Sequence, residues 1–261
     1  MYINYFSIIK QIMNLKKFFS FIIPIKNQEK FIHQNLNKLI TLINRLNCIA
    51  NFEIILIDDY STDNTFSIIK DLSLKNNKIK IYRNKSNMGK GFSIKKGVSL
   101  LNKKTNKFII LDSDIPYIEK IPQLVTKLIN NKCVIINRKT KKSKLIIKKK
   151  SFYVYYRLLI GHLFNFIFRL IGLTNIKDTQ AGLKGFDIQL RNYFNKIKTN
   201  GFLFDIEILY ILKKKNFLPI SVPCKYSISA DSSIKFNLRI YLKIIKDLIT
   251  IIYNFLKKNY D

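Results

Sequence analysis

The stretch FEIILIDDYSTDNTFSIIKDLSL, residues 52–74, indicates how this chain folds. It opens with a short apolar run that predicts a buried strand, and the run ends in two aspartates, Asp58 and Asp59. Residues that commonly cap helix N-termini come next, and apolar residues then recur at helical spacing. The cap candidates are Ser61, Thr62 and Asp63. The stretch therefore predicts a strand, an acidic turn and a helix in direct succession.

The same succession continues on both sides of this stretch. Further apolar strands are predicted at residues 18–25, 78–83, 107–112 and 132–137. Each of the first four strands along the chain is followed by a predicted helix. Continuous apolar strands that alternate with helices are typical of a mostly parallel sheet covered on both faces. We therefore expect an α/β fold, with ligands bound beyond the carboxyl ends of the strands.

The second half of the chain has a different character. A basic run, residues 138–150, leads into an amphipathic stretch at 151–174. A turn and short strand are predicted at 178–187 and a helix at 202–215. An edge strand is predicted at 217–227, because two prolines interrupt it. The chain then ends in a second amphipathic helix, residues 237–258, which is apolar on one face and basic on the other.

The composition limits the classes of function. The 261 residues include 47 Lys and Arg but only 16 Asp and Glu, which gives a formal net charge of +31. A 48% apolar content makes global disorder improbable. The charge predicts attraction to nucleic acid, anionic lipid or phosphorylated substrates. The cysteines stand alone without metal spacing, which argues against a disulfide framework. His33 and His162 have no partners at metal spacing and are expected to be structural.

Membrane insertion is not expected from the sequence. The first residues of the chain have no small-residue cleavage site, so no signal peptide is predicted. The amphipathic stretch 151–174 contains Arg157 and Arg169, which are costly in the centre of a bilayer. We expect this stretch and the helix at 237–258 to lie at a membrane interface, or else to be ordinary core helices.

Asp112 and Asp114 follow the apolar strand at 107–112 and are one residue apart. Two carboxylates at a strand end repel each other unless a cation or hydrogen bonds compensate them. Hard cations such as Mg²⁺ and Mn²⁺ take one or two carboxylates and complete their shell with substrate phosphates. The pair therefore predicts a divalent metal site, and a plain strand-to-turn junction is the alternative.

Two other turns at strand ends have similar alternatives. Asp58 and Asp59 could cap a helix, or accept a hydrogen bond from a nucleotide base or ribose hydroxyl. The loop NKSNMGKG, residues 84–91, could be a simple connection. Its backbone N–H groups near Gly89 and Gly91, with Lys90, could instead meet a phosphate at a helix N-terminus.

Taken together, these motifs resemble glycosyltransferase family 2. The matching segments are FIIPIKNQE (21–29), IILIDDYSTDNT (54–65), NKSNMGKGFSIKKG (84–97) and FIILDSD (108–114). Tyr60 departs from the family pattern, which usually has Gly there. The resemblance implies a GT-A-type, Rossmann-like fold with a mostly parallel sheet, a nucleotide-sugar donor and a metal at Asp112 and Asp114. It also implies nucleotide-binding residues, namely Pro24, Asn27, Glu29, Asp58, Asp59, Lys90 and Asp112.

The second half is similar to the dolichyl-phosphate glucosyltransferase and mannosyltransferase branch of that family. The segments IKDTQAGLKGFD (176–187) and FLFDIEILY (202–210) carry this resemblance. It implies catalytic roles for Asp178 and Gln180 together with Asp114. Asp178 would orient groups or lie near the metal, with a general-base role as the lesser option. Asp205 and Glu207 lie about 200° apart on a helix, so only one of them is expected to face the site.

The implied acceptor is a polyprenyl phosphate. A phosphate with a second pKa of about 6 is mostly anionic at neutral pH and needs cationic positioning more than a strong base. The candidates come from the basic run, in which a solvated loop is the alternative for most lysines. They are Arg138, Lys148, Lys149 and Lys150.

The sequence therefore predicts an inverting hexosyltransferase that uses Mg²⁺ or Mn²⁺. It would move glucose from UDP-glucose to dolichyl or polyprenyl phosphate, as a peripheral protein on the cytoplasmic face of an anionic membrane. The catalytic domain would span residues 18–227 and the membrane-surface helix 237–258. Alternatives are a GDP-mannose donor, or a glycan hydroxyl as acceptor. A basic nucleic-acid-binding protein is disfavoured, because clustered strand-end acids would repel phosphate without a metal; no nucleic-acid partner is expected.

Overall fold

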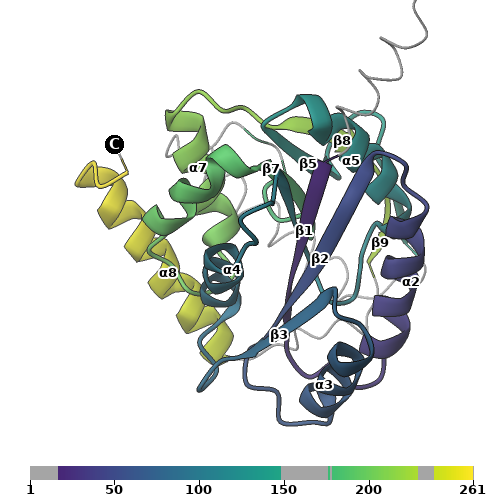
Figure 1. Cartoon of the computed structure of the whole chain (residues 1–261). Coiled ribbons are helices and arrows are strands. Elements are labelled where there is room, and N and C mark those ends of the chain that lie inside the picture. The colour runs from purple at the N-terminus through teal and green to yellow at the C-terminus, as the bar shows by residue number, and fades with distance from the viewer. Residues whose placement is uncertain (1–16, 148–175, 177, 229–237, 261) are drawn as a thin grey trace, which may run out of the picture.

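A computed structural model describes residues 17–147, 176, 178–228 and 238–260 of the chain (Figure 1). A seven-stranded sheet forms its centre, in the order β3-β2-β1-β4-β7-β5-β8. Its strands are β1 (Lys17–Ile25), β2 (Ile49–Asp58), β3 (Ile79–Arg83), β4 (Lys107–Leu111), β5 (Cys133–Asn137), β7 (Leu183–Asp187) and β8 (Ile220–Pro223). A separate two-stranded sheet pairs β6 (Lys144–Ile147) with β9 (Lys225–Ile228).

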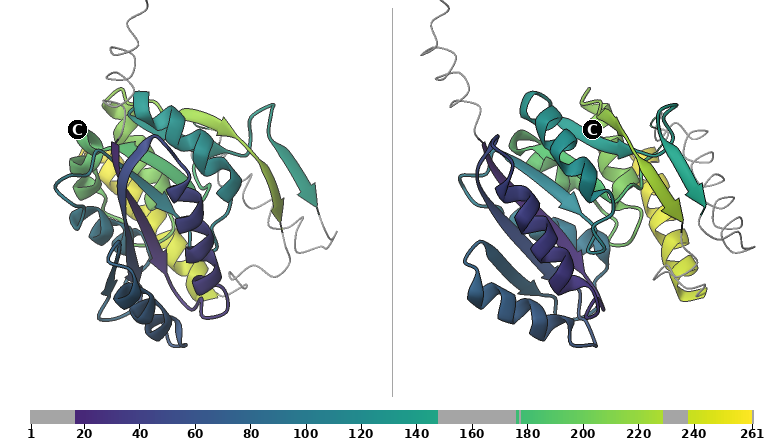
Figure 2. Two further views of the ribbon diagram at one scale, coloured as in Figure 1. Left: turned by 45° about the vertical axis from the view of Figure 1, so that its right-hand side comes forward. Right: turned by 90° about the vertical axis from the view of Figure 1, so that its right-hand side faces the viewer.

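Helices cover both faces of the large sheet, as Figures 1 and 2 show. One face carries α2 (Ile32–Asn44), α3 (Thr65–Lys75) and α5 (Ile121–Asn130). The other carries α4 (Lys90–Ser99), η2 (Ile188–Lys196), α7 (Phe204–Lys214) and α8 (Leu238–Leu256). A short turn of 3₁₀ helix, η1 (Ile118–Lys120), precedes α5. The strands of the sheet centre are buried on both sides, which explains their continuous apolar sequence.

Strand β7 is antiparallel to both of its neighbours. Leu111 of β4 pairs with Leu183 of β7, and Ile135 of β5 pairs with Lys184. The other strand pairs of the large sheet are parallel. Because β7 runs in the opposite direction, the residues just before it lie at the edge where β4 and β5 end. This places the segment before Leu183 beside Asp112 and Arg138.

The predicted mostly parallel sheet flanked by helices is confirmed, including the edge strand, which is β8. The prediction that Ser61, Thr62 or Asp63 caps the helix was wrong, because the N-cap of α3 is Asn64. Asp63 still contributes, since its Oδ1 accepts a hydrogen bond from the Thr65 backbone N–H. Part of the basic run is strand β6 rather than loop. Lys148, Lys149, Lys150, His162 and the stretch 151–174 lie outside the described residues.

Helix α8 has two apolar faces. Ile244, Leu248, Ile251 and Phe255 pack against the hydrophobic core. A second set of large apolar side chains on the same helix is exposed to solvent, and it comprises Leu242, Ile245, Ile249, Tyr253 and Leu256. No helix among the described residues is long and apolar enough to cross a bilayer. Cys48, Cys133 and Cys224 are free thiols, as expected.

Candidate functional site

The sequence-predicted acids meet at one edge of the large sheet. The carboxyl ends of β1, β2, β4 and β5 and the start of β7 all lie there, because of the strand directions. Asp58 ends β2, Asp112 follows β4 and Arg138 follows β5. The topology therefore brings to one edge residues as far apart in the chain as Ile25 at the end of β1 and Leu183 at the start of β7.

Asp112 is held on two sides. Its Oδ1 lies 2.6 Å from Nζ of Lys90, the first residue of α4, and its side chain is 30% exposed. Its backbone N–H donates to the Gly182 carbonyl oxygen at 3.0 Å. A Cβ at Gly182 would collide with Asp112 Oδ2, so any other residue there would force this carboxylate to shift. Burial opposes the charge on Lys90, but attraction from Asp112 and Asp205 raises the pKa of its ammonium.

Asp114 lies in the tight turn that follows β4. The backbone there is unusual, because Ile115 and Tyr117 have φ of 46° and 63°, in the left-handed region. A β-branched residue rarely adopts this conformation, so the turn is strained. The Ile115 N–H donates to the Asp112 carbonyl oxygen and closes the turn. Asp114 is exposed and acts electrostatically on Lys90, so both carboxylates lie near the same ammonium.

Two carboxylates fit a divalent cation of the hard class. Mg²⁺ and Mn²⁺ prefer oxygen ligands, and Mg²⁺ in particular uses few protein carboxylates together with substrate phosphates. Across the part of the chain that the structure describes, no cluster of three or more His, Cys, Asp or Glu side chains could hold a metal by itself. A metal at Asp112 and Asp114 would thus need ligands from a bound phosphate compound.

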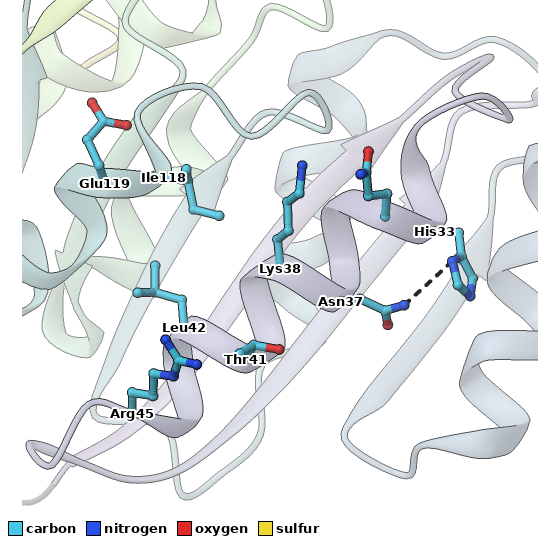
Figure 3. A pocket seen from close by; sticks show the side chains of 9 residues that line it. His33, Asn37, Lys38, Thr41, Leu42, Arg45, Ile118 and Glu119 are labelled. Carbon is cyan, nitrogen blue, oxygen red and sulfur yellow. Dashed lines mark hydrogen bonds between the residues drawn. The ribbon is translucent and has the colours of Figure 1, made fainter.

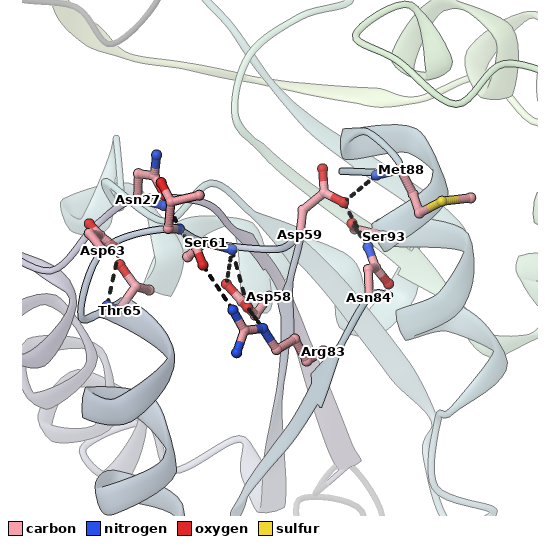
Figure 4. A network of polar contacts seen from close by, with 11 residues as sticks. Asn27, Asp58, Asp59, Ser61, Asp63, Thr65, Arg83, Asn84, Met88 and Ser93 are labelled. Atoms are coloured by element: carbon pink, nitrogen blue, oxygen red, sulfur yellow. Dashed lines mark hydrogen bonds and ion pairs between the residues drawn. The ribbon is translucent and has the colours of Figure 1, made fainter. Parts of the chain in front are cut away.

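Asp58 and Asp59 are buried, and their carboxylates bond to the protein itself (Figure 4). Asp58 Oδ2 lies 3.0 Å from Arg83 Nε and also accepts from the Ser61 backbone N–H. Asp59 accepts from the Asn84 side chain and from the backbone N–H groups of Met88 and Gly89. The pair thereby ties the ends of β2 and β3 to the start of α4. Binding of a nucleotide by Asp58 and Asp59 stays a prediction.

The loop after β1 is joined to the loop after β2. Asn27 Oδ1 accepts from the Thr62 N–H, and Glu29 Oε2 accepts from the Asn64 N–H. Pro24, in β1, is partly exposed near this junction. Tyr60 has a φ of 60°, a conformation in which glycine would be unstrained, which explains why a glycine is usual in the family pattern. Nucleotide binding by Pro24, Asn27 and Glu29 also stays a prediction.

The N-terminus of α4 is not open to a phosphate as the loop sequence suggested. The Gly91 and Phe92 N–H groups donate to the carbonyl oxygens of Gly201 and Asn200. The Gly89 N–H donates to Asp59. Gly89 has a φ of 99°, and a Cβ there would collide with Asn200. These N–H groups already have acceptors in Asp59, Asn200 and Gly201, which favours the alternative of a simple connection over a phosphate site on them.

Asp178 is fully buried and bonds tightly to Arg138. Its carboxylate accepts from Arg138 Nε at 2.8 Å and Nη2 at 2.7 Å, and from the Arg138 backbone N–H at 2.8 Å. Burial opposes ionisation, but these contacts prevail and lower the pKa of Asp178. A buried carboxylate whose charged form is stabilised is a poor general base. The structure thus disfavours that option and gives Arg138 a structural partner in addition to its predicted phosphate role. Gln180 is exposed nearby.

Asp205 and Glu207 point to different partners, as their helical spacing predicted. Asp205 Oδ1 lies 2.7 Å from Nζ of Lys184, and burial raises the pKa of Asp205. It faces the Lys90 and Asp112 side of the site. Glu207 accepts hydrogen bonds from the backbone of Lys198, from the backbone and side chain of Thr199, and from the Tyr260 hydroxyl. Glu207 therefore fixes the 197–201 loop that covers α4.

Sequence reasoning missed three residues that shape this edge, namely Asn84, Gly182 and Lys184. Asn84 was visible only as the residue after a strand, and Gly182 only as part of DTQAG. Lys184 could not be distinguished from the many other lysines. It is nevertheless buried, donates to the Ala181 carbonyl oxygen at 2.6 Å and pairs with Asp205.

A hollow of the described surface lies away from this edge of the sheet. It has a volume of about 550 Å³ and runs along α2 (Figure 3). Lys38 and Arg45 line it on the side of this helix, and Glu119 of η1 lines it on the other side. His33 lines it and lies 3.5 Å from Asn37. This hollow contains none of the predicted site residues, and its lining offers no group of converging acids.

Comparison with known proteins identifies the family. The sequence profile described as Glycosyl transferase family 2 matches residues 20–190. The chain belongs to glycosyl transferase family 2. Glycosyl transferase family 2 is a family of enzymes, and the resemblance inferred from the motifs is confirmed.

Curated relatives agree with the narrower resemblance. A dolichyl-phosphate beta-glucosyltransferase of Trichomonas vaginalis is 26% identical in an alignment of length 226 that covers 83% of this chain and 66% of that protein. The dolichyl-phosphate beta-glucosyltransferase of Saccharomyces cerevisiae is 27% identical over 226 residues, covering 77% of this chain and 64% of its own length. The family 2 chain thus spans about two thirds of these relatives.

Solved structures confirm the GT-A-like fold. Mannosyl-3-phosphoglycerate synthase from Rubrobacter xylanophilus superimposes with a TM-score of 0.66 at 14% identity, over 95% of this chain and 76% of that one. Glucosyl-3-phosphoglycerate synthase from Mycobacterium tuberculosis, in complex with Mn²⁺ and UDP-glucose, superimposes with a TM-score of 0.60 at 14% identity. The match covers 94% of this chain and 82% of that one. At this identity the likeness shows the fold alone.

Proposed function

We propose that this family 2 chain transfers a hexose, glucose in the first place, from a nucleotide sugar to dolichyl or another polyprenyl phosphate. The observation that carries the proposal is its similarity to dolichyl-phosphate beta-glucosyltransferases over 77–83% of its length. The gathering of Asp112, Lys90, Asp178 and Arg138 at one sheet edge supports it. UDP-glucose is the favoured donor and GDP-mannose the alternative.

The donor side consists of the loops after β1, β2 and β4. Asp112 and Asp114 would hold a Mg²⁺ or Mn²⁺ ion, which when bound neutralises the diphosphate leaving group. Asp58 and Asp59 hold the loops on which a nucleotide would lie, through Arg83, Asn84 and the backbone of α4. Pro24, Asn27 and Glu29 are proposed to complete the nucleotide side.

The acceptor side lies where β5 ends and β7 begins. An acceptor phosphate oxygen would attack the anomeric carbon while the bond to the diphosphate breaks on the opposite face, which inverts the configuration. The attacking oxygen is already anionic, so no proton has to be removed. Asp178 would hold the Arg138 guanidinium in place, and the side chain of Arg138 is 29% exposed. Gln180, Lys148, Lys149 and Lys150 are proposed to contact the acceptor.

Helix α8 is proposed to hold the protein on a membrane surface. Its outer face carries five exposed apolar side chains, Lys243 and Lys246 are exposed on the same helix, and the exposed Lys257 follows its last residue. An apolar stripe beside lysines is typical of helices that lie in the headgroup region of anionic bilayers. We propose a peripheral location on the cytoplasmic face, a catalytic domain at 18–227 and a surface helix at 237–258.

A parallel donor assay tests this function. The protein is incubated with Mn²⁺ or Mg²⁺, a polyprenyl phosphate, and either UDP-glucose or GDP-mannose, and lipid-linked sugar is detected by mass spectrometry. We expect product with UDP-glucose and a metal, and none after addition of EDTA. Product with GDP-mannose alone would assign the mannosyl alternative. Failure with both donors would refute the polyprenyl-phosphate function, and transfer to a glycan hydroxyl would assign the other alternative.

A further inference from the structure

The amine of Lys90 lies against the carboxylate that the proposed function assigns to a metal. Lys90 Nζ is 2.6 Å from Asp112 Oδ1, and its side chain is only 22% exposed. The ammonium also interacts electrostatically with Asp114 and Asp205. Lys90 thus occupies the centre of the acidic group that would attract a divalent cation.

The fold fixes the backbone of Lys90, whereas its amine is carried on a long aliphatic side chain. The Gly89 N–H donates to Asp59 and the Gly91 N–H donates to the Gly201 carbonyl oxygen. Hydrogen bonds therefore hold the backbone on both sides of Lys90. Besides the acids, Nζ lies 5.7 Å from the centroid of the Phe204 ring. A lysine carries a compact charge on a flexible stem, so it can exchange one anion for another without moving the helix.

The second oxygen of Asp112 offers a cation no easy alternative. The main chain of Gly182 lies against Oδ2, so closely that a Cβ there would collide with this oxygen. A cation that approaches Asp112 therefore meets the side of the carboxylate that Lys90 already holds. A metal and Lys90 compete for the same anionic position.

We propose that Lys90 is a resident counter-ion of Asp112, which a divalent cation displaces and which then pairs with the diphosphate of the donor. The inference rests on the proposed function and specifies how the cation and the donor diphosphate bind to its donor site. The exchange moves no covalent bond and no proton: the ammonium leaves a carboxylate oxygen and meets a phosphate oxygen.

This arrangement couples metal binding to donor binding. Without a diphosphate, a metal has to compete with an ammonium that is covalently part of the chain. With a diphosphate present, Lys90 gains a second anionic partner and Asp112 becomes available. The donor therefore raises the affinity for the metal. Because coupling between two ligands is reciprocal, the metal raises the affinity for the donor by the same factor.

Mn²⁺ titrations with and without UDP test the proposal, with free Mn²⁺ measured by electron paramagnetic resonance. We expect Lys90→Gln to bind Mn²⁺ on the order of fivefold more tightly than the wild type when UDP is absent. The gain in Mn²⁺ affinity on adding UDP should be smaller in Lys90→Gln than in the wild type. Lys90→Arg keeps the charge and should retain the wild-type competition.

Lys96→Gln is the matched control, because Lys96 is exposed on the same helix and its loss changes the net charge equally. Its Mn²⁺ affinity should equal that of the wild type. If Lys90→Gln binds Mn²⁺ no more tightly than the wild type without UDP, or if Lys96→Gln gains as much, the role of Lys90 is refuted while the transferase function stands. If the wild type binds no Mn²⁺ even with UDP, the metal part of the proposed function fails as well. Lys90→Met provides a second neutral variant should Lys90→Gln not fold.

Discussion

Asp112 and Asp178 lie at the same edge of the sheet, and each pairs with one basic side chain, but in contrasting ways. Asp112 is 30% exposed and meets a single lysine amine through one oxygen. Asp178 is 0% exposed and accepts three hydrogen bonds from the guanidinium and backbone of Arg138. A forked arginine contact is stronger and more directional than a lysine contact.

The difference suggests two roles for carboxylates within one site. A partly exposed carboxylate that meets a single lysine amine can exchange that partner for a metal. A buried carboxylate with a fixed bidentate partner serves to hold that partner in position. Asp112 should therefore matter for activity and Asp178 for stability, and the following experiments test this division, from the largest expected effect to the smallest.

Asp112→Asn should have the largest effect. Removal of the charge takes away the predicted metal ligand and should lower transfer by about 10²-fold or more, the size seen when one electrostatic group of an active site is lost. The unfolding temperature should change less than for Asp178→Asn, because Asp112 is partly exposed and Lys90 keeps the attraction of Asp205 and Asp114. Transfer rate and thermal unfolding are measured on the same preparation. Retained activity would remove Asp112 from the metal site.

Asp178→Asn should act mainly on stability. It leaves the Arg138 guanidinium partly buried with no full counter-charge, which should lower the free energy of unfolding by about 2–3 kcal/mol, somewhat less than for a fully buried pair. Denaturant unfolding measures the change. Adding Arg138→Gln should recover part of the loss, since the pair is then removed as a unit. Independent, additive losses in the double variant would contradict the coupling.

Gly182→Ala should displace Asp112 and leave Asp178 in place. The added Cβ collides with Asp112 Oδ2, and a small misplacement of a reacting group costs activity. We expect transfer to fall by about tenfold, with a smaller change in unfolding temperature. Gly97→Ala serves as the counterpart, because its Cβ would collide with core residue Ile22 instead. That variant should lose stability while keeping its activity per folded molecule.

The pH dependence of stability should show the smallest effect. The folded-state pKa of Asp178 is lowered, since the Arg138 contacts outweigh burial. Its stabilisation is therefore complete above the unfolded pKa of about 3.9 and is lost as pH falls through the lower folded value. The wild type should lose stability below about pH 4 more steeply than Asp178→Asn. Asp63 and Asp187 shift in the same direction in both proteins, so the difference isolates Asp178. An equally steep loss of stability below about pH 4 in the wild type and in Asp178→Asn would contradict this assignment.

The strands and helices around the donor side could be predicted from the sequence because they are local patterns. The apolar runs that became β1, β2 and β4 are continuous, and the polar turns after them are short. Asp58, Asp59 and Asp112 were recognised from their position after such runs. Their position at one common edge of the sheet could be predicted because parallel strands all end at the same edge.

The partners of those residues could not be predicted in the same way. Arg138 and Asp178 are 40 positions apart, and they meet because β7 runs antiparallel between β4 and β5. The carbonyl groups of Asn200 and Gly201 close the start of α4 from about 110 positions away. No local pattern contains this information, which is why the sequence left a phosphate site on α4 open as an alternative.

The sequence by itself therefore determined the α/β class, the family and the chemical types at the site. Hydrophobic periodicity and residue identity are properties of neighbouring positions, so they can be read along the chain. Only the tertiary structure decided which carboxylate is buried with an arginine and which is partly exposed beside a lysine. That choice depends on strand direction and on glycines such as Gly182 that allow close approach, and both arise only when distant segments pack together.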